Sequence, residues 1–163
     1  MLRVGIVGIG FMGWIHTLAY RKVKGAKVVA YCEQNPKRLA GDWTDIKGNF
    51  GPPGEQMDMR PFACYENLGA MLSDPKIDLV DICLPPGAHA STTIQALKAG
   101  KHVFCEKPIA LTASDGKKML KASTDSEKQL FIGHVLPFFS EYAYAQKVIS
   151  SGKYGKLLGG HFK

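Results

Sequence analysis

The feature of this sequence that most constrains its fold is a glycine-rich junction close to its start. The opening run "VGIVGIGFMGWIH" contains the pattern G-x-G-x-x-G at Gly8, Gly10 and Gly13. A short, β-branched apolar segment at residues 2–7 precedes the pattern, and apolar residues at helical spacing follow it. Since glycine weakens both strands and helices, its density here indicates a special turn between a buried strand and a helix.

Each glycine of the pattern has a separate chemical reason to be there. Gly8 permits the tight turn, Gly10 lets the backbone approach a pyrophosphate, and Gly13 lets the helix pack closely on the strand. The N–H groups of Phe11, Met12 and Gly13 would then point at the phosphates, assisted by the helix dipole. The junction predicts dinucleotide binding, and a glycine-rich turn used only for packing is the alternative.

The rest of the chain alternates between short apolar runs and helical patterns. Beyond residues 2–7, we predict five more strands, at 27–32, 62–65, 78–84, 102–106 and 129–133. Helices between strands indicate βαβ units with right-handed crossovers, so we predict an α/β fold with a doubly wound parallel sheet. The Gly- and Pro-rich residues 47–61 interrupt this pattern as an inserted loop. Thr112 and Asp115 have capping-box-like spacing at the start of a helix.

The chain closes with a helix, "YAYAQKVISSG", and then with "KLLGGHFK", which reads as the start of a seventh strand. A seventh strand needs a partner sheet, which suggests that a second domain is missing. We therefore expect residues 1–133 to form a dinucleotide-binding Rossmann domain. Residues 134–163 would be a linker helix and the beginning of a second α/β domain.

Two residues after the second predicted strand bear on the choice of coenzyme. Glu33 lies 20 residues beyond Gly13, where a carboxylate grips the adenosine ribose hydroxyls and repels a 2′-phosphate. An ordinary solvated carboxylate is the alternative. NAD is favoured, and NADP stays possible because Arg38 could reach a 2′-phosphate, stack on adenine or merely face water, the commonest fate of an arginine.

Lys107 follows the fifth predicted strand in "CEKPIA". Ligands of doubly wound sheets bind beyond the carboxyl ends of the strands, so Lys107 is expected to face the coenzyme. A lysine there could stabilise the alkoxide that forms as hydride leaves a substrate. A surface lysine paired with Glu106 is the equally simple alternative.

Four segments together resemble one enzyme family: "GIVGIGFMG", "DLVDICLPPGAHA", "EKP" and "SGKYGKLLGG". They resemble the glucose–fructose oxidoreductase, inositol dehydrogenase and rhizopine-catabolism (GFO/IDH/MocA) family, across almost the whole chain. The resemblance implies an N-terminal Rossmann domain, a C-terminal α/β domain, and NAD(P)-dependent oxidation or reduction of sugars and polyols. It also implies that Lys107 contacts substrate and nicotinamide and that Leu84, Pro85, His89 and Glu106 adjoin the coenzyme.

Two departures from the family pattern concern the substrate. Pro137 stands where the family often has an arginine after the sixth strand. The family's catalytic Asp/His set lies in the second domain, so no proton-transfer group is assigned here. The resemblance further implies a homo-oligomer assembled through the second domain.

Composition excludes several other classes of protein. The 163 residues carry a formal charge of +7, but the basic residues are scattered and do not form a nucleic-acid face. No apolar run approaches the length of a membrane span, and the glycines argue against a signal peptide. The four cysteines lack metal-ligand spacing, and we expect reduced, mostly buried thiols in the cytoplasm.

The sequence thus favours an NAD(P)-dependent oxidoreductase acting on a small sugar- or polyol-like substrate, of which this chain is the coenzyme-binding part. A non-catalytic module that senses or sequesters dinucleotide is the second hypothesis. A nucleotide-sugar or methyl-donor binder is a third, against which the "EKP" segment argues.

Overall fold

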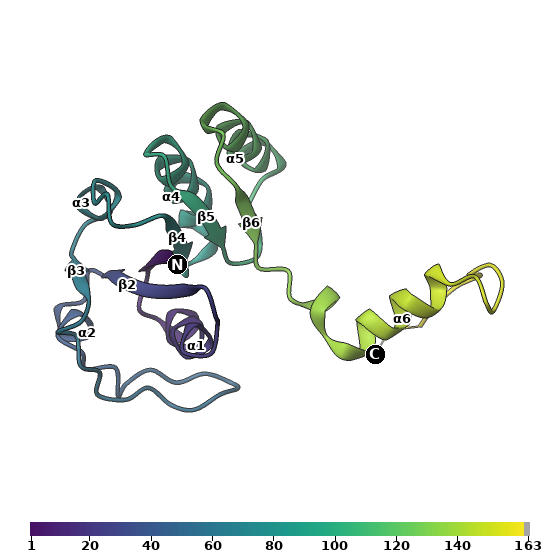
Figure 1. Ribbon diagram of the computed structural model, residues 1–163, viewed down its shortest axis with the longest axis horizontal. Helices are drawn as coiled ribbons and strands as arrows, with labels where there is room; N and C mark the ends of the chain where they lie inside the picture. The colour runs from purple at the N-terminus through teal and green to yellow at the C-terminus, as the bar shows by residue number, and fades with distance from the viewer. Residues whose placement is uncertain (162–163) are drawn as a thin grey trace. The chain divides into compact units, whose positions relative to one another are not determined.

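The computed structural model describes residues 1–161, and the chain divides into two units, Met1–Gly133 and His134–Lys163. The first unit is built on one six-stranded sheet with the order β3-β2-β1-β4-β5-β6 (Figure 1). All neighbouring strands are parallel. The strands are β1 (Leu2–Val7), β2 (Ala26–Cys32), β3 (Ala63–Tyr65), β4 (Leu79–Ile82), β5 (His102–Cys105) and β6 (Leu130–Ile132). The predicted doubly wound parallel sheet is confirmed.

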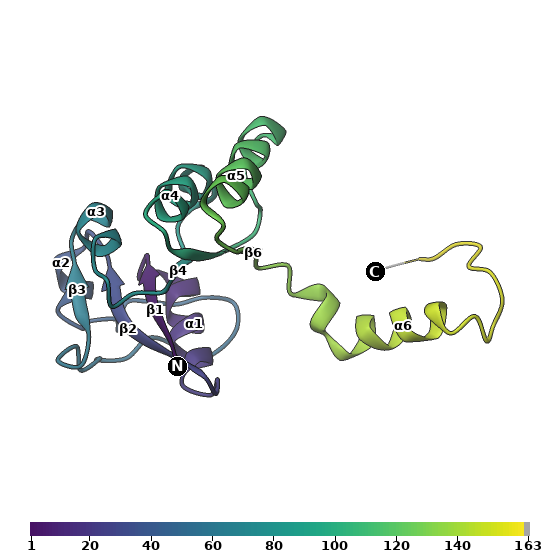
Figure 2. The same ribbon diagram turned by 45° about the horizontal axis from the view of Figure 1, so that its top comes forward.

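The helices of this unit cover both faces of the sheet (Figure 2). They are α1 (Phe11–Tyr20), α2 (Pro36–Leu39), α3 (Leu68–Leu72), α4 (Pro86–Lys98) and α5 (Ala113–Ser126). The chain winds outward from β1 through β2 to β3, then returns to pair β4 with the other side of β1. The reversal lies at the carboxyl ends of β1 and β4, which is where sheets of this kind bind ligands.

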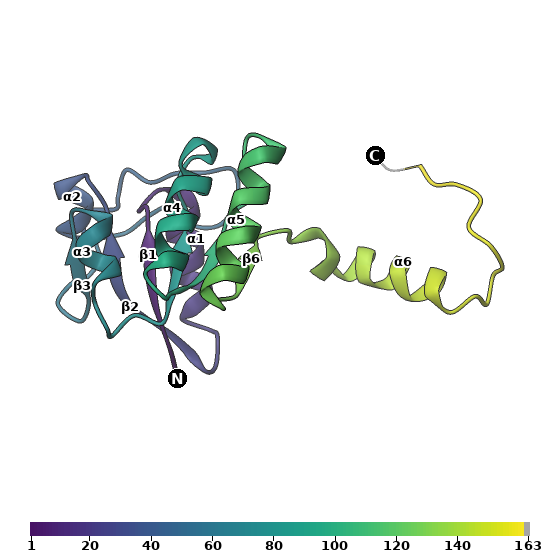
Figure 3. The same cartoon turned by 90° about the horizontal axis from the view of Figure 1, so that it is seen from above.

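Two apolar cores lie on opposite faces of the sheet. Helices α3, α4 and α5 pack on one face over Val80, Ile82 and Val103, and α4 runs beside α5 (Figure 3). The other face buries Ile6 and Leu79 beneath α1 and the loop between α2 and β3. The alternation of inward residues along β4 places Val80 and Leu79 in different cores.

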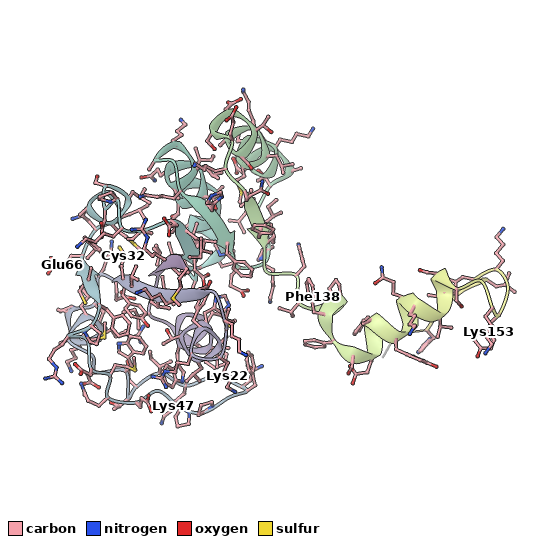
Figure 4. All side chains as sticks on the ribbon, viewed as in Figure 1. Lys22, Cys32, Lys47, Glu66, Phe138 and Lys153 are labelled. Carbon is pink, nitrogen blue, oxygen red and sulfur yellow. The ribbon has the colours of Figure 1, made fainter. Side chains whose placement is uncertain are left out.

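The loop between α2 and β3 contributes a large share of the second core. It is irregular, as predicted, with one isolated bridge between Asp42 and Gln56. Trp43 is fully buried, and its ring makes edge contacts with Trp14 and Tyr31. The loop, which carries Lys47 (Figure 4), therefore packs as a part of the domain.

Side-chain caps define where helices α2 and α5 begin. Asn35 accepts a hydrogen bond from the Lys37 amide, 3.0 Å away, at the start of α2. At the start of α5 the Thr112 hydroxyl accepts from the Asp115 amide at 3.1 Å and donates to the Asp115 carboxylate at 2.9 Å. The side-chain N-cap expected at Thr112 is present, but Asp115 accepts from the Thr112 hydroxyl and not from the Thr112 main-chain N–H that a complete capping box uses.

The second unit contains a 3-10 turn at Leu136–Phe138 and helix α6 (Ser140–Ser150), which begins two residues before the predicted start; Figure 4 labels Phe138. The seventh strand predicted at 156–163 is wrong for residues 156–161, which are irregular; residues 162 and 163 lie outside the described part. A strand needs a neighbour for its N–H and C=O groups, and no strand of residues 1–161 pairs with this segment. Within residues 1–161 no helix is long and apolar enough to cross a membrane.

The four cysteines carry free thiols. Cys32 and Cys105 are buried and Cys83 is half-buried, but Cys64 is exposed, against the predicted pattern of mostly buried thiols. Cys64 lies on β3, an edge strand of the sheet, which has β2 as its single neighbouring strand.

Candidate functional site

The turn between β1 and α1 brings two glycines into places that no other residue fits. Gly8 has a φ of +95°, which L side chains rarely adopt, and a β-carbon there would lie 2.9 Å from the Cys83 carbonyl oxygen. A β-carbon at Gly13 would overlap the Gly8 carbonyl oxygen. These glycines allow α1 to start directly against the ends of β1 and β4.

Gly10 differs from the other two because its glycine is not required by its protein neighbours. No heavy atom lies within 4 Å of the position that a Gly10 β-carbon would take. The first hydrogen bond of α1 runs from the Trp14 amide to the Gly10 carbonyl at 3.0 Å. The N–H groups of Phe11, Met12 and Gly13 therefore have no acceptor within the helix, and they lie at the positive end of its dipole. Open space beside these donors fits a phosphate group.

Glu33, just beyond β2, lies against this turn. One of its carboxylate oxygens accepts the Ile9 amide at 2.8 Å. The other oxygen accepts the amides of Gln34 and Asn35 at 2.7 Å and 3.0 Å. Three of about four acceptor positions of the carboxylate are thus filled. The remaining one suits a hydroxyl donor such as a ribose hydroxyl, and the negative charge disfavours a phosphate.

Arg38 in α2 is only partly exposed and is held by protein hydrogen bonds, so it does not merely face water. It is half-buried, and Nη1 donates to the Ile9 carbonyl at 2.9 Å while Nη2 donates to Asp45 at 3.1 Å. Glu33 and Arg38 therefore hold the two ends of the Ile9 residue. Asp45, from the loop between α2 and β3, pairs with the guanidinium that a 2′-phosphate would need.

The segments that follow β4 and β5 are held together by His89. Its ring is fully buried, with Nδ1 2.7 Å from the Pro108 carbonyl oxygen and Nε2 2.8 Å from the Leu84 carbonyl oxygen. Because both nitrogens meet backbone oxygens, His89 ties the loop after β4 to the segment after β5. Pro85 is exposed and forms the N-cap of α4.

Glu106 and Lys107 lie at the end of β5 with opposite exposure. Glu106 is buried, whereas Lys107 is exposed. The contact between them is made by the main-chain N–H of Lys107, which donates to Glu106 Oε2 at 3.1 Å. Lys107 thus lies at the carboxyl edge of the sheet, the edge at which Gly8 and Leu84 also lie.

A buried polar cluster beside this edge was missed by sequence reasoning. Its centre is His16 of α1, whose Nδ1 lies 2.9 Å from Asp81 Oδ2 and 3.3 Å from Cys83 Sγ. On the other side of the ring, Nε2 lies 3.1 Å from Glu106 Oε1. The imidazole therefore bridges a carboxylate at the end of β4 to the one at the end of β5.

The charges of the cluster follow from its hydrogen bonds. Burial opposes protonation of His16, but the hydrogen bonds to its three partners outweigh burial and raise its pKa from 6.5 to about 12. The His16 hydrogen bond in turn holds the pKa of Glu106 below its ordinary value. Burial raises the pKa of Cys83 to about 12, so this thiol stays protonated at neutral pH.

His16, Asp81 and Cys83 bring their donor atoms within 4.8 Å of one another, which is also a grouping that could hold a metal ion. An imidazolium has both nitrogens protonated and offers no lone pair to a metal. We therefore interpret the cluster as a hydrogen-bonded network. The signal for it in the sequence was Asp81, a charged residue within an apolar strand, because a buried charge requires a partner.

Comparison with known proteins agrees with this geometry. Residues 2–134 match the GFO/IDH/MocA family, described as an oxidoreductase family with an NAD-binding Rossmann fold. A 2,7-anhydro-N-acetylneuraminate hydratase of Escherichia coli is 32% identical over 100% of this chain and 40% of its own length. A levoglucosan dehydrogenase of Pseudarthrobacter phenanthrenivorans is 34% identical over 96% of this chain and 39% of its own.

Solved structures show the same fold. The WlbA dehydrogenase from Bordetella pertussis, crystallised with NADH and UDP-GlcNAcA, superposes with a TM-score of 0.80 at 26% identity, covering 94% of this chain and 41% of that one. A myo-inositol 2-dehydrogenase from Lactobacillus plantarum gives 0.77 at 28% identity, with 96% and 43% covered.

The chain spans about 40% of the length of the curated relatives named above. The family match covers nearly all of the first unit, including the glycine turn and the segment around Lys107. The expected resemblance and the expected NAD coenzyme are both confirmed. This chain therefore belongs to the GFO/IDH/MocA family of oxidoreductases and carries its NAD-binding Rossmann domain.

Proposed function

We propose that this chain supplies the coenzyme-binding part of an NAD-dependent oxidoreductase. The reaction is hydride transfer between nicotinamide and a hydroxyl or carbonyl group of a sugar- or polyol-like compound. The observation that carries the proposal is the open start of α1, where Gly10 leaves space beside three amides without helical acceptors. Levoglucosan and inositol dehydrogenases among the relatives support the substrate class.

In this proposal each end of the site has its own task. The amides of Phe11, Met12 and Gly13 bind the pyrophosphate, and Glu33 accepts a ribose hydroxyl with its free acceptor position. The adenosine thus extends toward β2, and the nicotinamide toward β4 and β5. We propose that Leu84 and Pro85 line the nicotinamide side, on loops joined by His89.

NAD supplies the acceptor for the hydride when it is bound. Lys107 directs its ammonium group to the substrate oxygen and stabilises the alkoxide from which hydride leaves, or polarises the carbonyl in the reverse direction. The proton of the substrate hydroxyl passes to a group outside this chain. We propose that residues 134–163 lead into the domain that carries this group.

The coenzyme preference is tested by titrating the chain with NADH and with NADPH and following nicotinamide fluorescence. We expect NADH to bind more tightly, and Glu33→Ala to narrow the difference because it removes the repulsion of a 2′-phosphate. Equal affinities of the unaltered chain for both coenzymes would contradict the role given to Glu33.

The role of Lys107 is tested in a polypeptide that extends beyond residue 163. Lys107→Ala is expected to leave NADH binding within about threefold and to abolish turnover of sugars and polyols, since the alkoxide loses its cation. Lys98→Ala, on the last turn of α4, is the matched control and should change neither. Turnover that survives Lys107→Ala unchanged refutes the chemical role.

A non-catalytic module that binds NAD is the second candidate. It would share the glycine turn and Glu33 but would make no use of Lys107. An extended polypeptide that binds NADH and reduces or oxidises no compound in a panel of sugars and polyols would favour this candidate.

A further inference from the structure

We propose that His16 is a positioning residue: through Glu106 it fixes the main chain at Lys107 and thereby the direction in which the lysine side chain enters the coenzyme edge. The inference rests on the role proposed above for Lys107. It gives a function to the buried cluster of His16, Asp81, Cys83 and Glu106, which the proposed binding of the coenzyme does not explain.

Glu106 is the link, because each of its oxygens has a different partner. Oε1 lies 3.1 Å from His16 Nε2, and Oε2 accepts the Lys107 amide at 3.1 Å. The side chain is 9% exposed, and a β-carbon at Gly133 would lie 3.0 Å from Oε1. The carboxylate is therefore held at both oxygens, by α1 on one side and by the Lys107 main chain on the other, and it lies against Gly133 at the end of β6.

His16 is itself held from the opposite side. Asp81 is fully buried, and both of its oxygens lie within 3.1 Å of His16 Nδ1. The His16 ring also meets the Phe104 ring edge-on, with centroids 5.7 Å apart. Anchored on β4 and packed on β5, the imidazolium presents its second N–H to Glu106 in one direction only.

The two divergent donors explain why a histidine occupies this place. A bridge between two carboxylates requires two N–H groups on one rigid frame, which an imidazolium provides. A neutral imidazole would supply one donor and leave one carboxylate unpaired, and an unpaired buried carboxylate is costly. The raised pKa of His16 keeps both donors at neutral pH.

The consequence for the site is geometric. The Lys107 side chain is exposed and free to turn, so its origin on the main chain sets where the amine can reach. Misplacement of a reacting group by about 1 Å can cost on the order of a hundredfold in rate. Side chains that hydrogen-bond behind a reacting group are a recognised means of holding it in place.

The test compares three variants of the 163-residue chain by ¹⁵N–¹H spectroscopy and NADH titration. His16→Gln keeps donors on a single nitrogen and loses the second, divergent N–H. Glu106→Gln loses the carboxylate, and Lys98→Gln, on the exposed last turn of α4, is the control. The Lys107 amide is the reporter, and the Val103 amide, inside β5, is the reference for general loosening.

We expect Lys107 amide exchange to quicken about tenfold or more in His16→Gln and Glu106→Gln, because its charge-assisted acceptor is displaced or lost. The Val103 amide should change less than about threefold, and NADH affinity should also stay within about threefold, since the glycine turn is untouched. The control should leave both amides unchanged.

If His16→Gln folds and the Lys107 amide exchanges at an unchanged rate, the positioning role is overturned. It is also overturned if exchange of the Val103 amide quickens as much as exchange of the Lys107 amide. If His16→Gln fails to fold, Glu106→Gln decides by the same two amides. Failure of the unaltered chain to bind NADH refutes the proposed function instead, whereas the amide comparison still tests the link from His16 to Lys107.

Discussion

Replacing Gly10 by alanine should separate coenzyme binding from folding. Gly10 has φ −100° and ψ −163°, an extended conformation that alanine adopts without strain. Its β-carbon would have no heavy atom of the protein within 4 Å. The added methyl group would enter the space that we assign to the pyrophosphate.

The expected magnitudes follow from these surroundings. Alanine lowers the entropy of the unfolded chain and stabilises by about 0.4–1 kcal/mol at a compatible site. It is also a poorer N-cap than glycine, which offsets part of that gain. We therefore expect the free energy of unfolding to change by less than about 1 kcal/mol. Losing two charge-assisted hydrogen bonds to phosphate, at about 1.5 kcal/mol or more each, should weaken NADH binding by about a hundredfold.

Gly13→Ala is the matched opposite, because its β-carbon would overlap the Gly8 carbonyl oxygen. Separating α1 from the turn should cost about 1–3 kcal/mol or more of stability. Urea unfolding followed by circular dichroism measures both variants, and NADH fluorescence measures binding by Gly10→Ala. If Gly10→Ala binds NADH as tightly as the unaltered chain, the pyrophosphate does not lie at this turn, and the reasoning is refuted.

Three further predictions concern the cluster, a helix cap and coenzyme choice. The His16 imidazolium contributes stability that is complete below pH 6.5 and is lost as pH rises toward its folded pKa of about 12. The free energy of unfolding, measured with urea, should therefore fall by an amount on the order of 2 kcal/mol from pH 7 to pH 9. This fall should be absent in His16→Asn. Above pH 9 the raised pKa of Cys83 lowers the free energy of unfolding further, because the thiol ionises in the unfolded chain before it does in the folded one. A free energy of unfolding that does not change with pH would contradict the raised pKa values of both His16 and Cys83. Thr112→Ala should cost about 1 kcal/mol in the same assay, and no loss would mean that the cap is immaterial. Asp45→Asn should free the Arg38 guanidinium and raise the affinity for NADPH about threefold to fivefold, with the affinity for NADH unchanged, in a fluorescence titration. An unaltered preference for NADH over NADPH would show that the Arg38–Asp45 ion pair does not influence the choice of coenzyme.

The local patterns of the sequence determined the fold class and the glycine turn. The run that forms β1 and the Gly8, Gly10, Gly13 spacing describe a strand, a turn and a helix that touch one another along the chain. The N-cap at Thr112 is equally local, since its partner is three residues away. Such features depend on backbone conformation and periodicity, so they are legible without the tertiary structure.

The seventh strand shows where local pattern fails. The sequence predicts that residues 156–161 begin a strand, but they have no neighbouring strand among residues 1–161. Strand formation depends on hydrogen bonds to another segment, which the sequence of one segment does not contain.

The surroundings of the candidate site were decided by the tertiary structure alone. His16 meets Asp81 across 65 residues and Glu106 across 90, and Arg38 reaches Ile9 across 29. The parallel sheet order brings the ends of β4 and β5 side by side and sets α1 against them, which creates these meetings. The sequence by itself determined that the first turn offers main-chain amides to a phosphate. Sheet order and helix packing decided that His16, Asp81 and Glu106 lie in contact, and this contact sets the protonation state of the His16 imidazole.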